Sequence, residues 1–426
     1  MKLWSESPSL DELVERFTVG NDRELDLRLA RFDVIGSLAH GRMLHEQGMM
    51  SEGEWRGVKR GLDDLLEEIE RGDFVIDDRF EDVHSKVEAE LIDRVGEGGK
   101  KIHTARSRND QVLLDIHLWA REELRGVTEL LGLLFDRLLL LAERHQEDLM
   151  PGYTHMQVAM PSSFGLWFGA YAEALIDDVS FLKAAARVAD QNPLGSAAGF
   201  GSSFPIDRER TTELLGFGRL RINAVSAGLS RGKLEWMIAV AFASIASTVA
   251  RMAGDIVLYS GGNFGFFSLP QAFVTGSSIM PHKKNPDVFE LIRAHCNLVR
   301  STPEAIATLT TNLPTGYHRD YQLLKELLFP AATRLRDSLI LAERGLSEIQ
   351  VHTDWQEDER YAHLYTVEEV NRLVREGLPF RDAYMQVAES IREGTYRPST
   401  ALDHTHLGSI GNPAIEAIRE KMTGEL

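Results

Sequence analysis

Residues 109–149 read NDQVLLDIHLWAREELRGVTELLGLLFDRLLLLAERHQEDL, a stretch in which apolar side chains recur at the spacing of a helix. No proline occurs between Pro8 and Pro151, and an internal proline would remove a helix hydrogen bond and clash with the preceding turn. The pattern therefore predicts one continuous helix, about 60 Å long at the usual rise of roughly 1.5 Å per residue.

Three further stretches have the same character. Residues 162–190, 231–259 and 287–309 are apolar on more than one helical face. Helices of this kind bury their surfaces by packing into a bundle, and surplus apolar surface is usually covered by further copies of the chain. The sequence thus predicts an all-α, long-helix bundle that assembles into a homo-oligomer.

The composition limits the class of protein. The 426 residues include 65 acidic and 47 basic side chains, a formal net charge of -18, which repels the phosphates of nucleic acid. An anionic substrate must therefore be held by a local positive site. The single cysteine, Cys296, cannot form an internal disulfide, and we expect a buried, reduced thiol in a cytoplasmic protein.

The most apolar stretch, residues 236–250, has no charge and is shorter than the roughly 20 residues of a membrane span. It also contains Ser244, Ser247 and Thr248. We therefore expect a helix buried among other helices, and no membrane partner. The first residues, MKLWSE, lack the charged segment and apolar stretch of a secretory signal.

Four polar loops that contain glycine and proline separate the predicted helices, at residues 96–108, 150–161, 191–207 and 261–286. These loops hold most of the unusual residue combinations. We expect three domains, with weak boundaries near residues 105 and 350: an N-terminal helical domain of residues 1–105, a central long-helix bundle of residues 106–350 and a small C-terminal helical domain of residues 351–426.

The loop at residues 275–286, TGSSIMPHKKNP, places small residues, hydroxyls, two lysines and an amide between two apolar helices. Glycine lets backbone N–H groups approach a ligand, and the lysines favour negative charge. The loop could therefore hold a carboxylate and stabilise a developing carbanion. The alternative is a mobile surface loop.

Two further loops are candidates for the site. In HTARSRNDQ at residues 103–111 we expect Asn109 to cap the long helix, and Arg106 and Arg108 to favour an anion at the helix N-terminus. The alternative is a capped helix with two solvated arginines. In PGYTHMQ at residues 151–157, His155 follows a proline break, where it could transfer a proton; the alternative is a structural histidine.

No nucleotide or metal cofactor is expected. The glycines at 195, 199 and 201 lack the spacing of a dinucleotide-binding loop. His84 with Glu88, and His404 with His406, could each supply two metal ligands, but neither pair has an evident third ligand in the sequence. We interpret them as a helix face and a solvated turn.

Residues 276–286, GSSIMPHKKNP, resemble the signature loop of the fumarase and aspartase superfamily. Within it, RSRNDQ at residues 106–111, GYTH at 152–155 and KKN at 283–285 resemble the argininosuccinate lyase family. The likeness extends from about residue 17 to residue 350. In the tail, GLPFRDA at residues 377–383 looks like a family segment, but Tyr384 stands where a histidine is usual.

The resemblance implies a homotetramer built around a central twenty-helix bundle, with each active site assembled from loops of three subunits. It also implies the β-elimination of a small-molecule substrate, argininosuccinate, to arginine and fumarate without a cofactor. This is a step of arginine biosynthesis of the urea-cycle type.

The same resemblance implies roles for single residues. Ser277 takes the proton from the carbon next to the substrate carboxylate, and Lys283 and Asn285 help to stabilise the resulting aci-carboxylate. His155, oriented by Glu290, is the other candidate for proton transfer, and the likeness leaves open whether it acts on the leaving group or positions a water. The residues implied to bind substrate are Ser107, Arg108, Asn109, Thr154, Tyr317, Gln322 and Lys325, with His84 close by.

One departure from the family concerns the arginine end of the substrate. Many members carry a substrate-binding serine in an early Phe-x-x-Ser segment, whereas this chain reads FTVGND at residues 17–22, with Gly20 at the serine position. We hypothesise that Asn21 or Asp22 takes the place of that serine.

Two other functions compete with this reading. One is another fumarate-producing lyase of the superfamily, such as adenylosuccinate lyase, aspartase or fumarase, and the RSRNDQ stretch argues against it. The other is a non-catalytic structural protein like the crystallin relatives of the family. This second alternative is disfavoured because the chain retains the residues assigned to catalysis, Ser277, His155, Lys283 and Glu290.

Overall fold

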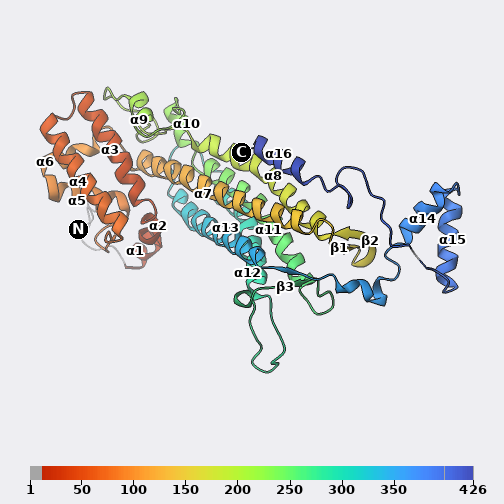
Figure 1. Cartoon of the computed structure of the whole chain (residues 1–426). Helices are drawn as coiled ribbons and strands as arrows, with labels where there is room; N and C mark the ends of the chain where they lie inside the picture. The colour runs from red at the N-terminus through yellow and green to blue at the C-terminus, as the bar shows by residue number, and fades with distance from the viewer. Residues whose placement is uncertain (1–11, 398, 426) are drawn as a thin grey trace. The chain divides into compact units, whose positions relative to one another are not determined.

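The computed structural model describes residues 12–397 and 399–425 and confirms the all-α prediction (Figure 1). Over these residues there are sixteen α-helices, and the four short strands form two separate two-stranded sheets. The chain packs as two compact units. Five long helices contribute residues to both units: α7 (Arg108–Arg144), α8 (Phe164–Ala189), α11 (Lys233–Tyr259), α12 (Asp287–Leu309) and α13 (Leu324–Ser347).

The apolar periodicity predicted four of these helices closely. Helix α12 has the predicted bounds, and the ends of α8 and α11 lie within two residues of the predicted ones. Helix α7 ends at Arg144 rather than at residue 149. His145 Nδ1 lies 2.7 Å from Asp148 Oδ2, which closes a turn there, and Pro151 could not continue a helix.

Unit 1 comprises residues 1–128, 181–243 and 298–334. Its helices α3, α4 and α5 pack around a core that includes Leu44, Leu62 and Leu91. Besides its parts of the long helices, unit 1 contains α1 (Glu12–Val19), α2 (Asp22–Asp26), α3 (Ala30–Glu46), α4 (Glu52–Arg71), α5 (Val83–Val95), α6 (Glu97–Lys100), α9 (Arg208–Leu214) and α10 (Ala224–Gly228).

The start of α5 is fixed by its own sequence. Asp82 precedes the helix in an extended conformation, and its Oδ1 accepts the backbone N–H of Ser85 at 2.8 Å. Acidic caps of this kind satisfy a free helix N–H group and favour the positive end of the helix dipole. This cap fixes the first turn of α5, the turn that carries His84.

Unit 2 comprises residues 129–180, 244–297 and 335–426. The polar loop predicted at residues 150–161 is a β-hairpin, in which β1 pairs antiparallel with β2. Besides its parts of the long helices, unit 2 contains β1 (Leu149–Thr154), β2 (Gln157–Ser163), β3 (Phe267–Ser268), β4 (Gln350–Val351), α14 (Thr366–Arg375), α15 (Phe380–Arg392) and α16 (Ile415–Glu425).

Aromatic rings form the core beneath the hairpin. Tyr153 of β1 lies 5.4 Å from Phe264 between ring centroids, and its hydroxyl lies 3.0 Å from that of Tyr361. The indole N–H of Trp355 donates to the carbonyl of Leu149 at 3.1 Å. Aromatic contacts bury large areas with a defined geometry, so the base of the hairpin is held firmly.

The tail of the chain forms a smaller cluster of its own. Helices α14 and α15 pack through Val370, Leu373, Ala383 and Val387, with Tyr396 beside them. The division of the chain into domains at residues 105 and 350 stays a prediction.

Helix α11 is long and apolar enough, by length and composition, to cross a membrane, because it extends to Lys233 and Tyr259 beyond the uncharged residues 236–250. The uncharged stretch itself is shorter than a span, but the helix that contains it is not. However, 56% of its most apolar window is buried inside the protein, as expected for the core helix of a bundle.

Candidate active site

Residues expected to bind substrate meet at one pocket of unit 1. Its volume is about 200 Å³. Ser107 lies directly before α7 and is not among the lining residues. Six of the expected residues line the pocket although they come from distant parts of the chain: His84, Arg108, Asn109, Tyr317, Gln322 and Lys325.

Arg108 is held at the pocket by the start of α5. Its Nη1 donates to Asp82 Oδ2 at 2.6 Å, and its Nη2 donates to Ser85 Oγ at 2.6 Å. Burial works to raise the pKa of Asp82, but His84 and Arg108 outweigh burial and hold that pKa below its usual value. Arg108 therefore faces an ionised partner and keeps a fixed position at the wall.

The start of α7 differs from the expectation. Asn109 was expected to be the cap, but the helix already begins at Arg108. Ser107 Oγ accepts the N–H of Asn109 at 3.3 Å, and Asp110 Oδ1 accepts the N–H of Ser107 at 2.8 Å. This reciprocal arrangement satisfies two helix-end donors. Asn109 instead lies in the first turn and lines the pocket.

Lys325 is buried between two carboxylates of the short helix α2. Its Nζ lies 2.7 Å from Asp22 Oδ1 and makes an ion pair with Asp26 Oδ1. Burial opposes the charge of Lys325, but Asp26 and Asp22 outweigh it and hold the pKa of the ammonium above its usual value. Lys325 is therefore a charged group at the pocket wall.

The end of α1 is fastened to the segment that precedes α13. Gln322 Nε2 donates to the carbonyl oxygens of Thr18 at 2.9 Å and Val19 at 3.2 Å. Arg319 Nη2 donates to the same Thr18 carbonyl at 2.9 Å. The side chain of Tyr317, in the loop before these residues, is 44% exposed and lines the pocket.

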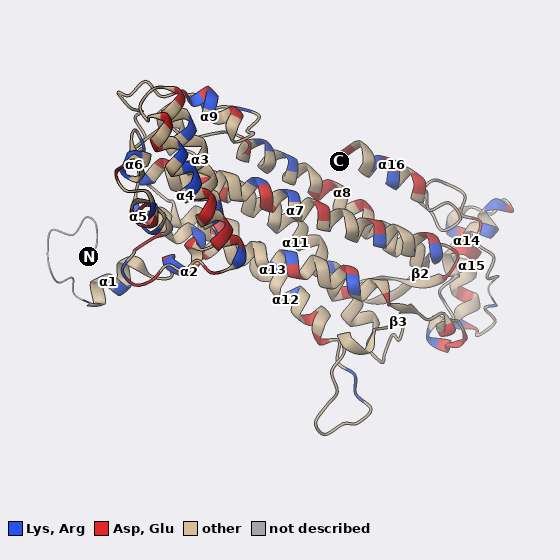
Figure 2. Ribbon diagram, turned by 60° about the vertical axis from the view of Figure 1, so that its left-hand side comes forward, with Lys and Arg blue, Asp and Glu red and all other residues tan. Residues whose placement is uncertain are grey.

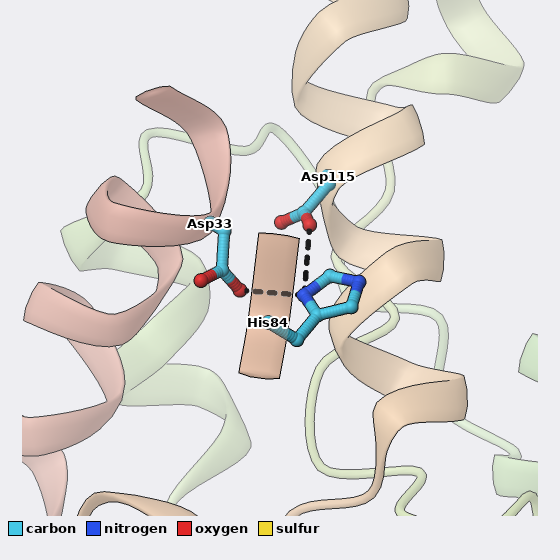
Figure 3. Close-up of side chains that lie close together, drawn as sticks. All are labelled: Asp33, His84 and Asp115. Carbon is cyan, nitrogen blue, oxygen red and sulfur yellow. Dashed lines mark hydrogen bonds and ion pairs between the residues drawn. The ribbon is translucent and has the colours of Figure 1, made fainter. Parts of the chain in front are cut away.

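His84 belongs to a buried cluster with two aspartates (Figure 3). Its Nδ1 lies 2.9 Å from Asp33 Oδ1 and 3.6 Å from Asp115 Oδ2. The helices α5, α3 and α7 each supply one of the three residues. Figure 3 shows Nδ1 directed between the carboxylates while the other ring nitrogen points away from them.

The cluster distributes its protons unevenly. Burial works to lower the pKa of His84, but Asp33 outweighs it and raises that pKa to about 9. Burial works to raise the pKa of Asp33, but His84 holds it below the usual value. Burial and the neighbouring charge of Asp33 raise the pKa of Asp115 far above its usual value. Asp33 and His84 thus favour each other's charged forms, whereas the surroundings of Asp115 favour its protonated form.

The same three side chains have the donor types of a metal site, with ligand atoms within 4.8 Å of one another. Spacing along the chain identified no third ligand for His84, because Asp33 and Asp115 come from distant helices. However, His84 Nδ1 already bonds to Asp33, the His84 imidazolium balances the Asp33 carboxylate, and the raised pKa of Asp115 favours its uncharged form. The residues therefore need no cation to balance their charge.

The loop that precedes α12 carries the predicted elimination residues of unit 2. It is closed at its base by Thr275 and Asn285, whose backbones exchange hydrogen bonds of 3.0 and 2.8 Å. Figures 1 and 2 show the loop extending beyond α11 and α12. The lysines in its sequence are Lys283 and Lys284, and it contains no acidic residue. A basic loop of this kind suits an anionic ligand.

Ser277 lies near the start of this loop. Its Oγ accepts backbone N–H groups from Ile279 at 3.3 Å and Met280 at 3.1 Å. Hydrogen bonds from donors favour the charged form of an oxygen acid. The local turn thus points two donors at the oxygen that the resemblance assigns as the base.

Two other predicted residues are exposed in this unit. Among the described residues, the Lys283 ammonium has no hydrogen-bond or ion-pair partner. Glu290, in the first turn of α12, has Arg293 as its partner at 4.0 Å, and the described residues include no hydrogen bond between Glu290 and His155. Both side chains are open to a ligand or to another chain.

His155 lies at the tip of the β-hairpin. It and Met156 form the two-residue turn, with φ values of 53° and 60°. Positive φ at both central positions is typical of the turns that join twisted strands. Thr154 ends β1 beside the turn, and both Thr154 and His155 are exposed.

Three acidic residues that hold side chains of the pocket were not found by sequence reasoning. Asp26, Asp33 and Asp115 are almost fully buried and hold Lys325 and His84. Asp115 gave one signal, since it interrupts the apolar run LLDIHLW; an acidic residue on a buried helix face usually has a charged partner.

Known proteins support the same assignment of fold and family. A family model described as "Lyase" matches residues 7–300. The chain is 52% identical over 411 residues to the argininosuccinate lyase of Bacteroides thetaiotaomicron, a match that covers 96% of this chain and 92% of that protein. It is 39% identical over 388 residues to the argininosuccinate lyase of Thermotoga neapolitana, covering 91% and 98% of the two chains.

Solved structures share the fold at lower sequence identity. The class II fumarase of Schistosoma mansoni matches with a TM-score of 0.77 and 17% identity over 89% of this chain and 88% of that chain. An EDDS lyase in complex with formate matches with a TM-score of 0.74 and 22% identity over 98% and 90%.

Proposed function

The chain belongs to the argininosuccinate lyase family, and from this membership we propose that it cleaves argininosuccinate to arginine and fumarate. The observation that carries the proposal is the Ser277 oxygen, which accepts two backbone N–H groups in a loop whose charged residues are all lysines. An elimination that begins with proton removal beside a carboxylate needs a base and positive charge together.

Ser277 removes the proton from the carbon next to a carboxylate of the succinyl part. The electron pair moves into that carboxylate, which becomes a doubly charged aci-carboxylate. Lys283 and Asn285 stabilise this charge. The pair then forms the double bond of fumarate as the carbon–nitrogen bond breaks, and the guanidino nitrogen leaves with its electrons and is protonated to give arginine.

A serine hydroxyl is a weak base at its ordinary pKa. The backbone donors on Ser277 Oγ are already in place before substrate binds, so they need no rearrangement to favour the alkoxide. His155, with Glu290 as its orienting partner, handles the proton of the leaving group or positions a water. Thr154 binds substrate beside it.

The unit 1 pocket supplies the residues for the arginine end. In this proposal Arg108, Asn109, Tyr317, Gln322 and Lys325 bind substrate there. Ser107 contributes from the start of α7, and His84 presents its outward nitrogen as a donor. The protein uses no cofactor, acts on a small molecule, and has neither nucleic acid nor a membrane as a partner.

We further propose a cytoplasmic homotetramer with active sites shared between three subunits. Five long helices from each of four subunits would supply a twenty-helix core bundle. Apolar side chains on these helices are exposed in the single chain, among them Leu133 at 58%, Leu291 at 58% and Leu298 at 53%. Such surfaces are usually covered by other subunits.

The test is a panel of four substrates. Purified protein is mixed with argininosuccinate, adenylosuccinate, aspartate or malate, and fumarate is followed by its absorbance. Fumarate from argininosuccinate alone supports the proposal. Fumarate from another substrate would support the same elimination chemistry but assign a different substrate. No fumarate from any of the four would favour a non-catalytic structural protein.

A further inference from the structure

Two carboxylates of α2 share a single lysine at the pocket. Asp22 and Asp26 are one helical turn apart and face Lys325 Nζ. Asp26 is satisfied on both oxygens, because Oδ1 pairs with Lys325 and Oδ2 accepts the N–H of Val83 at 3.2 Å. Among the described residues, Asp22 has Lys325 as its partner on Oδ1 and none on Oδ2.

The charges at this wall do not cancel. Two carboxylates face one ammonium. Of the other positive groups of the pocket, Arg108 and Arg231 are engaged by Asp82 and Glu235, and Arg319 donates to the carbonyl of Thr18. The side chain of Asp26 is 1% exposed, while that of Asp22 is 13% exposed and lines the pocket. Asp22 is therefore an incompletely paired carboxylate that a ligand can reach.

The surroundings of Asp22 disfavour its ionised form. Burial raises the pKa of Asp22 to about 6, Lys325 opposes this effect, and the like charge of Asp26 adds to it. A cation that entered the pocket would relieve the penalty, since an opposite charge nearby favours the ionised form. A ligand group that is positive and carries hydrogen-bond donors would therefore stabilise the ionised form of Asp22 most.

We propose that Asp22 is a specificity-determining residue that binds the α-ammonium group of the arginine end of the substrate. This inference rests on the proposed function. Of the two cationic groups of argininosuccinate, the guanidinium is the leaving group and belongs with Ser277 and Lys283. The α-ammonium is the cation that remains for a pocket without elimination residues.

The neighbour of Asp22 strengthens this assignment. Lys325 lies 2.7 Å from Asp22, so a positive and a negative side chain stand next to each other at the wall. An α-amino acid presents an ammonium and a carboxylate with similar spacing. Lys325 can therefore take the carboxylate while Asp22 takes the ammonium, and a ligand without the ammonium leaves Asp22 uncompensated.

The experiment compares two co-substrates in the reverse reaction with saturating fumarate. One is arginine, and the other is 5-guanidinopentanoate, which is arginine without its α-amino group. We expect wild-type protein to prefer arginine, and Asp22→Asn to reduce the ratio of the two kcat/KM values by about tenfold or more, through the KM for arginine. Asp22→Glu should restore part of the preference.

Two control variants separate the explanations. Glu24→Gln removes the same charge from an exposed position of the same helix and should leave the ratio unchanged. Glu81→Gln tests a further acidic residue of the pocket. If Asp22 merely holds Lys325 in place, both co-substrates lose affinity equally, because both carry the carboxylate, and the ratio stays constant.

The outcomes are distinguishable. An unchanged ratio in Asp22→Asn, no preference in wild-type protein, or a collapse of the ratio in Glu81→Gln alone would overturn the inference. Failure of the wild-type protein to cleave argininosuccinate would instead overturn the proposed function. A thermal melt of each variant shows that the comparison is made between folded proteins.

Discussion

His84 Nδ1 lies 2.9 Å from Asp33 Oδ1 in the interior of unit 1, and the side chains of both residues are at most 6% exposed. A buried ion pair stabilises a fold little in comparison with a well-packed apolar pair, but the loss of one partner leaves a buried charge without compensation. The pair therefore makes the stability of the protein depend on pH and on Asp33.

The free energy of unfolding should fall between pH 6.5 and pH 9. In the unfolded chain a histidine has a pKa near 6.5, whereas in the folded protein Asp33 raises the pKa of His84 to about 9. The resulting stabilisation is complete below pH 6.5 and is lost as the pH rises through about 9. The raised pKa of Asp115 likewise lowers the stability of the folded state as the pH rises above the usual pKa of a carboxyl group. Urea unfolding at the two pH values measures the change.

Asp33→Asn should cost about 3–5 kcal/mol of stability at pH 6.5 and flatten the pH dependence, because His84 loses its ionised partner. Asp93→Asn, at an exposed position of α5, is the matched control and should resemble wild-type protein. An Asp33→Asn protein with the wild-type pH dependence would contradict the account of this cluster.

A chelator should leave the activity unchanged. The imidazolium of His84 balances the Asp33 carboxylate, and the raised pKa of Asp115 favours its protonated form, so this cluster does not need a divalent ion to offset its charge. Activity is compared before and after dialysis against EDTA, with the metal content of both samples determined. A loss that a divalent ion restores would assign Asp33, His84 and Asp115 to a metal instead.

Met156→Gly should raise the melting temperature slightly. Met156 has a φ of 60° at the tip of the hairpin, and glycine adopts this conformation without the steric cost that a side chain carries. The expected gain is about 0.5–1 kcal/mol. Met156→Val should have the opposite effect, because β-branched residues tolerate positive φ poorly. Equal melting temperatures in the two variants would argue against strain in this turn.

The sequence predicted those parts of the fold that depend on neighbouring residues, and it missed parts that depend on contacts between distant segments. Helix α12 was predicted residue by residue, because its apolar periodicity is a property of consecutive residues. The prediction of Asn109 as the cap of α7 was wrong, because the hydrogen bonds at the start of this helix involve Ser107 and Asp110. The strands of the hairpin were missed, since their aromatic contacts come from distant segments.

The candidate site divides in the same way. The motifs named the residues that face the unit 1 pocket, including Arg108, Gln322 and Lys325. They did not name Asp33 and Asp115, which approach His84 from other helices. Pairing across such separations is set by the packing of helices, and no spacing rule along the chain reports it.

Shared sites predict complementation. If each site takes loops from three subunits, inactive Ser277→Ala and His155→Asn proteins that are mixed, unfolded and reassembled should regain activity, because some sites receive neither defect. Fumarate release is measured on tetramers whose mixed composition is verified by mass spectrometry. Mixed tetramers without any recovered activity would count against sharing.

The most direct test of the account is fumarate release from argininosuccinate by wild-type, Ser277→Ala and Ser347→Ala proteins. Ser347 is an exposed serine at the end of α13 whose hydroxyl donates to a backbone carbonyl at 2.7 Å, so it controls for the loss of a hydroxyl alone. The account predicts that Ser277→Ala lowers kcat by about 100-fold or more, the usual minimum for the loss of a general base, with the KM nearly unchanged, while Ser347→Ala behaves as wild type. Full activity in Ser277→Ala would contradict the assignment of Ser277 as the base, and with it the proposed mechanism.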